Sequence, residues 1–397
     1  MRILILVDCY LPSTKSSAKL VHDLAVEWVR QGHEPVVAAP DDALSTPSEI
    51  SSEEGVTVLR VRTGRIKGAS KVRRAINEWR LPSVLWKAGK SFFRSHPCDL
   101  VVYYSPTIFF APLVRRLKRM WRCSAVLVLR DIFPQWAVDA GVLRRGSLPW
   151  RFFRRVEFQQ YAEADVICVQ SPANLAYFEQ QGLAGRYRLD VLYNWTPTEG
   201  EKVPTTDFRR RLGLDGKVVF FYGGNIGLAQ DMDNIVRLAR SLEDHEDLFF
   251  LLVGEGSEAP RLRERVRTRE LRNMMVHPGV DQQTYLGLLA EFDIGLISLD
   301  KALRTQNFPG KMLGYLYFAM PILASVNPGN DLREVLQEYQ AGLVTLNGED
   351  DALRTNALRL AQDAQLRRQL GQNGRRLLED LFSVRRAASQ ILSYAGA

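Results

Sequence analysis

A glycine-rich segment in the second half of this 397-residue chain has the composition of a phosphate-binding turn. The apolar run Val218–Tyr222 predicts a buried strand, and Gly223-Gly224-Asn225-Ile226-Gly227 follows it directly. Glycines let a backbone approach a diphosphate closely, and a helix that begins there supplies unpaired N–H groups. A tight strand-to-helix turn without any ligand also needs glycine, so that alternative stays open. The spacing is not Gly-x-Gly-x-x-Gly, which gives a nicotinamide cofactor little support.

A second segment, from Gln306 to Tyr315, places a lysine where a helix is expected to begin. It reads Gln306-Asn307-Phe308-Pro309-Gly310-Lys311-Met312-Leu313-Gly314-Tyr315. Pro309 suits the start of a helix, Gly310 removes steric bulk, and Lys311 falls in the first turn. A cation there opposes the helix dipole, so we expect Lys311 to neutralise a bound diphosphate. A solvated lysine is the alternative.

Two series of short apolar runs predict the elements that must position these segments. The first series is Ile3–Val7, Val36–Ala39, Val56–Val61, Leu100–Tyr104, Ala125–Leu129 and Val166–Val169. The second is Val218–Tyr222, Leu248–Val253, Met274–His277, Ile294–Ile297 and Pro321–Ser325. Helical stretches such as Ala18–Gln31 separate the runs, which is the alternation of a parallel sheet covered on both faces. The fold class predicted is therefore α/β, with two Rossmann-like doubly wound domains whose sheets present ligand sites at their carboxyl ends.

The length and a polar linker set the expected domain boundaries. A chain of 397 residues exceeds what one core usually organises, and Thr196–Thr206 carries Pro197, Gly200 and Pro204. We expect one domain over residues 1–197 and a second over 206–380. Residues 381–397 are expected to form a helix that returns to the first domain.

Positive charge is concentrated in the first half. Residues 1–200 hold 28 Lys and Arg against 19 Asp and Glu, whereas the remainder of the chain is nearly balanced. The segment Arg60–Arg94 alone holds eleven basic residues against Glu78, with aromatic residues between them. A basic amphipathic helix with aromatic anchors suits an anionic bilayer surface, and Arg115–Trp121 and Arg144–Arg155 add to that charge. A solvated basic helix folded over the domain is the alternative.

The composition excludes several other classes. The first residues are too short an apolar run for a signal peptide, and no run of about 18 apolar residues predicts a transmembrane helix. The four cysteines are scattered without metal-ligand spacing, as expected of reduced thiols in a cytoplasmic protein. We expect no metal site.

The lysine segment, followed by Phe318-Ala319-Met320-Pro321, resembles the C-terminal signature of the family 4 glycosyltransferases. Four other segments follow the order of that family: Tyr10-Leu11-Pro12 with Ser16-Ser17, Leu129-Arg130-Asp131-Ile132-Phe133-Pro134, Val191-Leu192-Tyr193-Asn194, and Leu251-Leu252-Val253-Gly254-Glu255-Gly256. The resemblance implies the GT-B fold and transfer of a sugar with retention from a nucleotide donor. It is closest to bacterial O-antigen and capsule transferases that add an N-acetylfucosamine-type sugar.

This chain departs from the family pattern at charged positions of the donor site. The two glutamates common in the family correspond to Gln306 and Gly314, and the basic pair after the glycine-rich loop corresponds to Asn225 and Gln230. We therefore expect diphosphate neutralisation to depend on Lys311, helped by Lys301 or Arg304, and ribose contact to come from Tyr315 or a neighbouring backbone group. The full set of expected donor-binding residues is Gly223, Gly224, Asn225, Gln230, Gln306, Asn307, Gly310, Lys311 and Tyr315.

The resemblance also implies an acceptor site in the first domain. Asp131 is expected there as orienter or base for the acceptor hydroxyl, with Lys311 as the other catalytic residue. Asp131 as a cap of the next helix is the alternative. Ser16, Ser17, Tyr104 and Ser105 are expected to contact the acceptor.

The leading hypothesis is a peripheral glycosyltransferase on the inner face of the cytoplasmic membrane. Its expected partners are a nucleotide diphosphate sugar, UDP-linked, and a polyprenyl-diphosphate-linked saccharide, with no further cofactor and no nucleic acid. Two alternatives are weighed against it. A nucleic-acid-binding protein would use the same basic face, but no known binding motif is recognisable. A sugar-nucleotide epimerase would share the layout, but its usual carboxylates and histidines are not evident.

Overall fold

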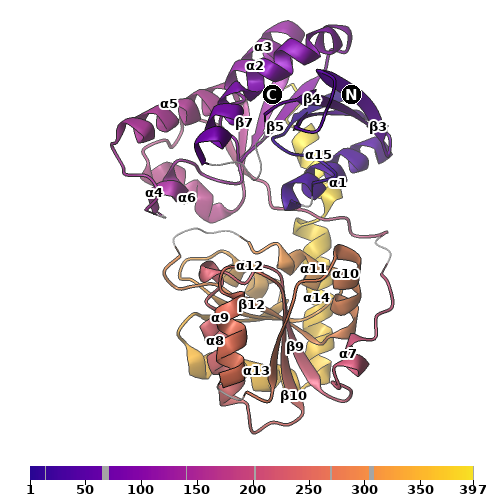
Figure 1. Ribbon diagram of the computed structural model, residues 1–397, viewed down its shortest axis with the longest axis vertical. Helices are drawn as coiled ribbons and strands as arrows, with labels where there is room; N and C mark the ends of the chain where they lie inside the picture. Colours follow the sequence, from indigo (N-terminus) through magenta and orange to yellow (C-terminus); the bar gives the residue numbers. More distant parts are fainter. Residues whose placement is uncertain are drawn as a thin grey trace. The chain divides into compact units, whose positions relative to one another are not determined.

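The computed structural model describes residues 1–13, 15–64, 71–139, 141–200, 203–268, 271–303 and 308–396, the side chains of Lys71, Val72 and Arg74 excepted. The chain forms two compact units (Figure 1). The N-terminal unit comprises Met1–Thr196 with Val384–Ala397, and the C-terminal unit comprises Pro197–Ser383. Each is built on one sheet flanked by helices, which confirms the predicted α/β class.

The N-terminal unit contains an eight-stranded sheet in the order β3-β4-β2-β1-β5-β6-β7-β8. Its strands are β1 (Arg2–Leu6), β2 (Glu34–Asp41), β3 (Ser48–Glu53), β4 (Val56–Arg62), β5 (Leu100–Tyr104), β6 (Ser124–Val128), β7 (Val166–Val169) and β8 (Leu189–Val191). All pairings are parallel except that of the edge strand β3 with β4. The apolar runs of the sequence predicted six of these strands but neither β3 nor β8.

Helices cover both faces of this sheet. They are α1 (Ser16–Arg30), α2 (Lys71–Ser95), α3 (Ala111–Trp121), α4 (Gln135–Asp139), α5 (Leu148–Glu163), α6 (Pro172–Gln180) and α15 (Val384–Leu392). Ile3 and Ile5 of β1 face the core beneath α1 and α15, whereas Leu4 and Leu6 face the core beneath α2 and α3. Alternate residues of a strand point to opposite faces, so a strand buried on both sides is apolar throughout.

Helix α15 is held in the N-terminal unit by polar as well as apolar contacts. The indole N–H of Trp28 in α1 donates to the carbonyl oxygen of Ala388 at 3.2 Å. The Tyr394 hydroxyl donates to Asp190 at 2.5 Å, and the Gln390 amide donates to the carbonyl oxygen of Val191 at 2.9 Å. The chain thus leaves the N-terminal unit after Thr196 and re-enters it at Val384.

The C-terminal unit contains a six-stranded parallel sheet in the order β11-β10-β9-β12-β13-β14. Its strands are β9 (Val218–Gly223), β10 (Leu248–Val253), β11 (Met274–His277), β12 (Ile294–Ser298), β13 (Ile322–Val326) and β14 (Gly342–Leu346). Its helices are α7 (Phe208–Arg211), the 3₁₀ helix η1 (Leu228–Gln230), α8 (Met232–Ser241), α9 (Ala259–Thr268), α10 (Gln282–Glu291), α11 (Lys311–Tyr317), α12 (Leu332–Glu338), α13 (Asp350–Gln362) and α14 (Ala364–Leu381).

The strand orders locate one ligand-binding position in each unit. The order reverses between β9 and β12 in the C-terminal unit and between β1 and β5 in the N-terminal unit. Connections leave in opposite directions at such a point, so the carboxyl ends of the two strands stay uncovered. Gly223 ends β9, and Tyr104 ends β5.

Among the described residues, no helix combines the length and the apolarity needed to cross a bilayer.

Candidate active site

Lys311 lies over the carboxyl end of β9. Its ammonium donates to the Tyr222 hydroxyl at 2.9 Å and lies 4.2 Å from the centroid of the Tyr222 ring. Gly224, the first residue after β9, has a φ of 126°, and a β-carbon there would lie 3.5 Å from Cε of Lys311. The left-handed backbone favours glycine at this position, and the missing side chain leaves Lys311 uncovered on that side. The two segments singled out in the sequence therefore meet.

The charge of Lys311 has no counterion in the part of the chain that the structure describes. Among the described residues, no carboxylate forms an ion pair with it, and the Tyr222 hydroxyl is its hydrogen-bond partner. Burial lowers the pKa of Lys311 to about 8 because removal from water disfavours the charged form. Burial raises the pKa of the neighbouring Tyr222 and Tyr285, so both phenols stay neutral around that pH. The site is thus a partly desolvated cation that an anion would stabilise.

The amides of the glycine-rich loop are mostly not available to a ligand, which corrects the expectation of an amide cradle. The N–H groups of Gly223 and Gly224 donate to the Tyr315 hydroxyl and to the carbonyl oxygen of Val253. Those of Ile226 and Gly227 donate to the carbonyl oxygen of Glu255 and to the Gln230 side chain. The amide of Asn225, an exposed residue, has no such acceptor among the described residues.

The loop is fixed by a second glycine turn rather than by a helix. A β-carbon on Gly254 would lie 1.8 Å from the carbonyl oxygen of Gly224, so the two turns pack backbone to backbone. The chain then forms η1, and α8 begins only at Met232. The expected strand–glycine–helix order was wrong in one detail, since no α-helix begins directly after Gly227. Instead, Gln230 of η1 caps the loop by accepting from the Gly227 amide and from the Asn225 side chain.

Tyr315 supports the site from within the core. Its side chain is fully buried, and its hydroxyl accepts from the amide of Gly223 at 3.2 Å. The same hydroxyl lies within hydrogen-bonding distance of the carbonyl oxygens of Phe221 and Leu296. A phenol used in this way positions the end of β9 and is not exposed to a ribose, so the expected ribose contact by Tyr315 is not supported.

The remaining donor-side residues are only partly placed. Gly310 is exposed, and a β-carbon there would contact none of the described atoms, so none of them requires glycine. Lys301 is also exposed. The expected residues Gln306 and Asn307, and the helper Arg304, lie outside the described residues.

In the N-terminal unit, Tyr104, Ser105 and Asp131 lie together at the carboxyl ends of β5 and β6. The Ser105 hydroxyl is 3.4 Å from both the amide nitrogen and the carbonyl oxygen of Asp131. Helix α4 begins at Gln135, four residues later, so Asp131 does not occupy its N-cap position. Tyr104 and Ser105 are themselves buried, which leaves the partly exposed Asp131 as the polar group of this cluster that an acceptor can reach.

Ser16 and Ser17 lie at the start of α1 and, within the described part of the chain, form no hydrogen bond with that cluster. Ser16 is exposed, and the Ser17 hydroxyl contacts the Cys9 thiol at 3.3 Å. They remain predictions as acceptor contacts.

Arg130 and Tyr222 have roles that the sequence did not reveal. The buried Arg130 donates to the carbonyl oxygens of Leu192 and Tyr193 at 2.6 and 3.4 Å, and its guanidinium lies 5.0 Å from the Trp195 ring. It therefore fixes the segment that leads out of the N-terminal unit. An arginine directly after an apolar strand was the available signal for it, whereas Tyr222 is indistinguishable from core residues in its apolar run.

The second half of the basic segment Arg60–Arg94 packs on the domain rather than presenting its aromatic residues. Leu81, Leu85 and Phe93 of α2 are fully buried, and the Trp86 ring carries the guanidinium of Arg116 at 4.6 Å. Arg60 pairs with Glu53 at 2.6 Å. Of the side chains of α2 that the structure describes, Ile76 and Trp79 are the large apolar ones that are exposed, so the alternative of a helix folded over the domain describes most of α2.

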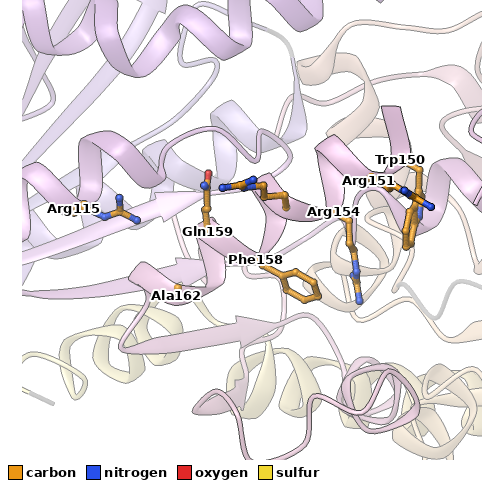
Figure 2. Close-up of a pocket in the computed structure, with 8 residues that line it drawn as sticks. Arg115, Trp150, Arg151, Arg154, Phe158, Gln159 and Ala162 are labelled. Carbon is orange, nitrogen blue, oxygen red and sulfur yellow. The ribbon is translucent and has the colours of Figure 1, made fainter. Parts of the chain in front are cut away.

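A groove of about 430 Å³ runs along α5 (Figure 2). Two of the guanidinium groups that line it are paired, Arg115 with Glu163 and Arg154 with Glu157. Burial raises the pKa of Glu157 to about 6, with Arg154 opposing that rise. Arg151 and Arg155 also line the groove, and neither forms an ion pair with a described residue.

Two family models together match most of the chain. Residues 17–195 match the glycosyl transferase 4-like domain, and residues 204–377 match glycosyl transferases group 1. A protein of Escherichia coli strain K12, provisionally named the colanic acid biosynthesis glycosyl transferase WcaI, is 27% identical over 80% of this chain and 81% of its own length. A Pseudomonas aeruginosa protein, provisionally named the glycosyltransferase WbjE, is 27% identical over 55% of this chain and 54% of its own length.

Solved structures confirm the predicted GT-B fold. Sucrose-phosphate synthase of Thermosynechococcus elongatus superposes with a TM-score of 0.71 at 16% identity, covering 99% of this chain and 97% of that structure. Anabaena HepE, determined in complex with UDP, superposes with a TM-score of 0.68 at 16% identity, covering 99% of both chains. The comparisons favour neither the nucleic-acid-binding alternative nor the epimerase.

Proposed function

Because the chain belongs to the family 4 glycosyltransferases with the GT-B fold, we propose that it transfers a sugar from a nucleotide diphosphate donor to a lipid-linked saccharide in bacterial surface-polysaccharide synthesis. One observation carries the donor half of this proposal. The Lys311 ammonium is partly buried at the switch point of the C-terminal sheet and has no carboxylate partner among the described residues. A diphosphate would supply the missing negative charge.

The proposed donor is UDP-linked. HepE, a structural neighbour, was determined with UDP and with UDP-glucose, which supports a uridine nucleotide by analogy of fold. The sugar to test first is of the N-acetylfucosamine type, on the ground of the sequence resemblance alone. Asn225 is exposed, and its carbonyl oxygen accepts from the Tyr222 hydroxyl to which Lys311 donates, at a position where the family pattern has a basic residue.

The proposed reaction proceeds with retention of configuration. The bond between the anomeric carbon and the diphosphate oxygen breaks while the acceptor oxygen bonds to that carbon from the same face. The acceptor proton passes to the departing diphosphate oxygen, and the Lys311 ammonium stabilises the negative charge that develops there. Asp131 orients the acceptor hydroxyl, and no protein nucleophile is needed.

The proposed acceptor is a saccharide on polyprenyl diphosphate, met at the inner surface of the cytoplasmic membrane. The name of the E. coli relative supports polysaccharide synthesis, and the nine surplus positive charges of residues 1–200 support an anionic surface as partner. Both remain part of the proposal.

The test is transfer itself. Purified protein is incubated with a panel of radiolabelled nucleotide sugars and polyprenyl-diphosphate-linked saccharides, and the lipid extract is counted. We expect one donor to label the lipid, and NMR of the product to show the anomeric configuration of the donor. Labelling by no donor of the panel would contradict the proposal, and inverted product would contradict the retaining step. A thermal-shift screen with nucleoside diphosphates identifies the base independently, because a bound ligand stabilises the fold by mass action.

A further inference from the structure

The region joining α4 to α5 exposes an unusual concentration of large apolar side chains. Ten large hydrophobic residues are exposed in the part of the chain that the structure describes, and four of them fall within residues 136–152. They are Leu148 (81% exposed), Val142 (57%), Phe152 (48%) and Trp136 (43%). Single exposed apolar residues are normal on a protein surface, whereas a contiguous group marks an interaction site.

Ring contacts bring the two ends of this region together. The Trp136 ring of α4 lies 5.8 Å from that of Phe133, which lies 5.0 Å from Phe153 of α5. Phe153 in turn lies 5.3 Å from Phe152. The loop between the helices folds back as well, with the amides of Val142 and Leu143 donating to the carbonyl oxygen of Ala137 at 2.9 Å. Trp136 and Phe152 thus belong to one surface backed by a packed aromatic cluster.

Unpaired arginines border the same surface. Arg144, Arg145, Arg151 and Arg155 are exposed, and none forms an ion pair within the described residues. The sequence from residue 140 to 156 holds no acidic residue. On α5 the apolar pair Leu148 and Phe152 and the basic pair Arg151 and Arg155 each have a spacing of four, so the two pairs run as adjacent stripes.

We propose that this α4–α5 surface, comprising Trp136, Val142, Leu148 and Phe152 with Arg144, Arg145, Arg151 and Arg155, docks the protein on an anionic phospholipid bilayer. The apolar side chains enter the boundary between headgroups and acyl chains. The guanidinium groups bind lipid phosphates, with Arg151 (Figure 2) and Arg155 doing so from the α5 groove. The inference depends on the proposed function only in taking a membrane as the place of the acceptor.

Charge complementarity selects this occupant over two others. A second copy of the chain would bring the same unpaired arginines face to face, which like-charge repulsion opposes. Nucleic acid would satisfy the arginines but would leave aliphatic Leu148 and Val142 without a stacking role. The α4–α5 surface also replaces the Arg60–Arg94 segment as the main contact, since most aromatic residues of that segment pack inward.

Vesicle flotation with the full-length protein tests the proposal. Vesicles of three parts phosphatidylcholine and one part phosphatidylglycerol are compared with vesicles of phosphatidylcholine alone. We expect binding to the anionic vesicles only. R151A/R155A should weaken that binding about tenfold or more, because each arginine near the membrane surface contributes roughly fivefold to the affinity. Leu148→Ser with Phe152→Ser should weaken it as well, and both variants should unfold at the wild-type temperature.

Matched controls assign the effect to this surface. R261A/R267A removes two arginines from α9, where each is paired with a carboxylate, and should bind vesicles like wild type. Trp79→Ser tests the exposed turn of α2, and this variant should also bind vesicles like wild type. Wild-type binding by R151A/R155A, loss caused equally by Trp79→Ser, or equal binding to neutral vesicles would each overturn the proposal. Duplex DNA that displaces the protein from vesicles would favour nucleic acid instead.

The proposal and the proposed function can fail separately. R151A/R155A should keep wild-type transfer to a water-soluble acceptor analogue and wild-type binding of UDP, while transfer to lipid-embedded acceptor falls. A protein that binds vesicles through this surface but transfers no sugar would contradict the function alone. A protein that transfers sugar to embedded acceptor equally well with and without these arginines would contradict the docking surface alone.

Discussion

Helices α5 and α9 are both rich in arginine, yet they differ in how many of these arginines are paired with carboxylates. Each of the four arginines of α9 has a carboxylate partner, with Arg261 and Arg265 sharing Asp233, Arg263 on Glu255 and Arg267 on Glu264. On α5, Arg154 is paired with Glu157, whereas Arg151 and Arg155 have no partner among the described residues. A basic run in a sequence therefore does not indicate an anionic partner, but positive charge left unpaired in the fold does.

Lys311 provides the most severe test of this comparison, because its unpaired charge is also partly buried. Lys311→Met keeps the length of the side chain and removes the charge, so we expect transfer to fall by about 100- to 1000-fold, as for the loss of one transition-state donor. Steady-state transfer to the water-soluble acceptor measures the effect. Lys217→Ala, a lysine that donates to the backbone of Glu246, is the control and should leave the rate unchanged. A Lys311→Met enzyme within about threefold of wild type would refute the comparison, since ordinary surface substitutions do no more.

Ionic strength should separate the two kinds of unpaired cation. Salt screens exposed charges strongly and buried ones much less. Raising NaCl from about 0.1 M to about 0.5 M should reduce partition to anionic vesicles roughly tenfold or more, while the affinity for UDP changes only about two- to threefold. Flotation and isothermal titration calorimetry measure the two quantities. Equal sensitivity would mean that Lys311 behaves as a surface charge.

The pH dependence sharpens the contrast further, because burial lowers the pKa of Lys311 to about 8. Its pKa of about 8 predicts that UDP affinity falls as pH rises above 8, by up to roughly tenfold per unit. The stability of the free protein should change in the opposite direction. Between pH 8 and the normal lysine pKa the unfolded chain binds the proton that the folded one has lost, so this group makes unfolding less favourable as pH rises. Lys311→Met should abolish both trends, and trends that persist in it would assign them to other groups.

A smaller effect is expected from the partner of Lys311. Tyr222→Phe removes a hydroxyl that accepts from Lys311 and donates to the carbonyl oxygen of Asn225 at 2.6 Å. We expect about a fivefold loss of UDP affinity, the equivalent of one hydrogen bond. Titration calorimetry of the variant beside Tyr285→Phe tests this, since among the described residues the Lys311 ammonium donates to Tyr222 and not to Tyr285. Equal losses in the two variants would show that the hydroxyl of Tyr222 has no special role.

The smallest effect belongs to the paired side of the comparison. Arg267→Ala removes one half of an exposed pair with Glu264 on the same helix. Such pairs contribute little to stability, so the midpoint of urea unfolding, the binding of vesicles and the transfer rate should all stay at wild-type values. A clear loss of vesicle binding would show that an exposed arginine can bind the membrane even when it is paired with a carboxylate.

The sequence was sufficient for most of the strands, though not for β3, β8 or β14, and for the meeting of two distant segments. Short apolar runs such as Leu248–Val253, repeated between helical stretches, indicate buried strands, and Gly224 and Lys311 were both expected beside a diphosphate. The edge strand β3 was missed because Ser48–Glu53 is polar, and its pairing with β4 depends on a partner that the local pattern does not reveal. The positions of β9 and β12 were predictable, but the contacts that their side chains make with distant residues, such as that of Tyr222 with Lys311, were not.

The missed features of the site depend on contacts between distant residues. The amides of the glycine-rich loop were expected to face a ligand, yet the turn at Gly254 and the Tyr315 hydroxyl engage them. Likewise, Trp79 and Trp86 are similar in sequence terms, but the first is exposed and the second packs beneath Arg116. Which face of a helix is covered is decided by neighbouring elements, and so is the pairing of its charges.

The return of α15 to the N-terminal unit has a consequence for biosynthesis. A ribosome completes residues 1–196 long before it makes Val384–Leu392, and the whole C-terminal unit emerges in between. Until then the indole N–H of Trp28 lacks its native acceptor, the carbonyl oxygen of Ala388, and the apolar surface beneath α1 is incomplete. The unit synthesised first is therefore the last to be finished, so the nascent chain must stay soluble with an unfinished first half while its second half folds.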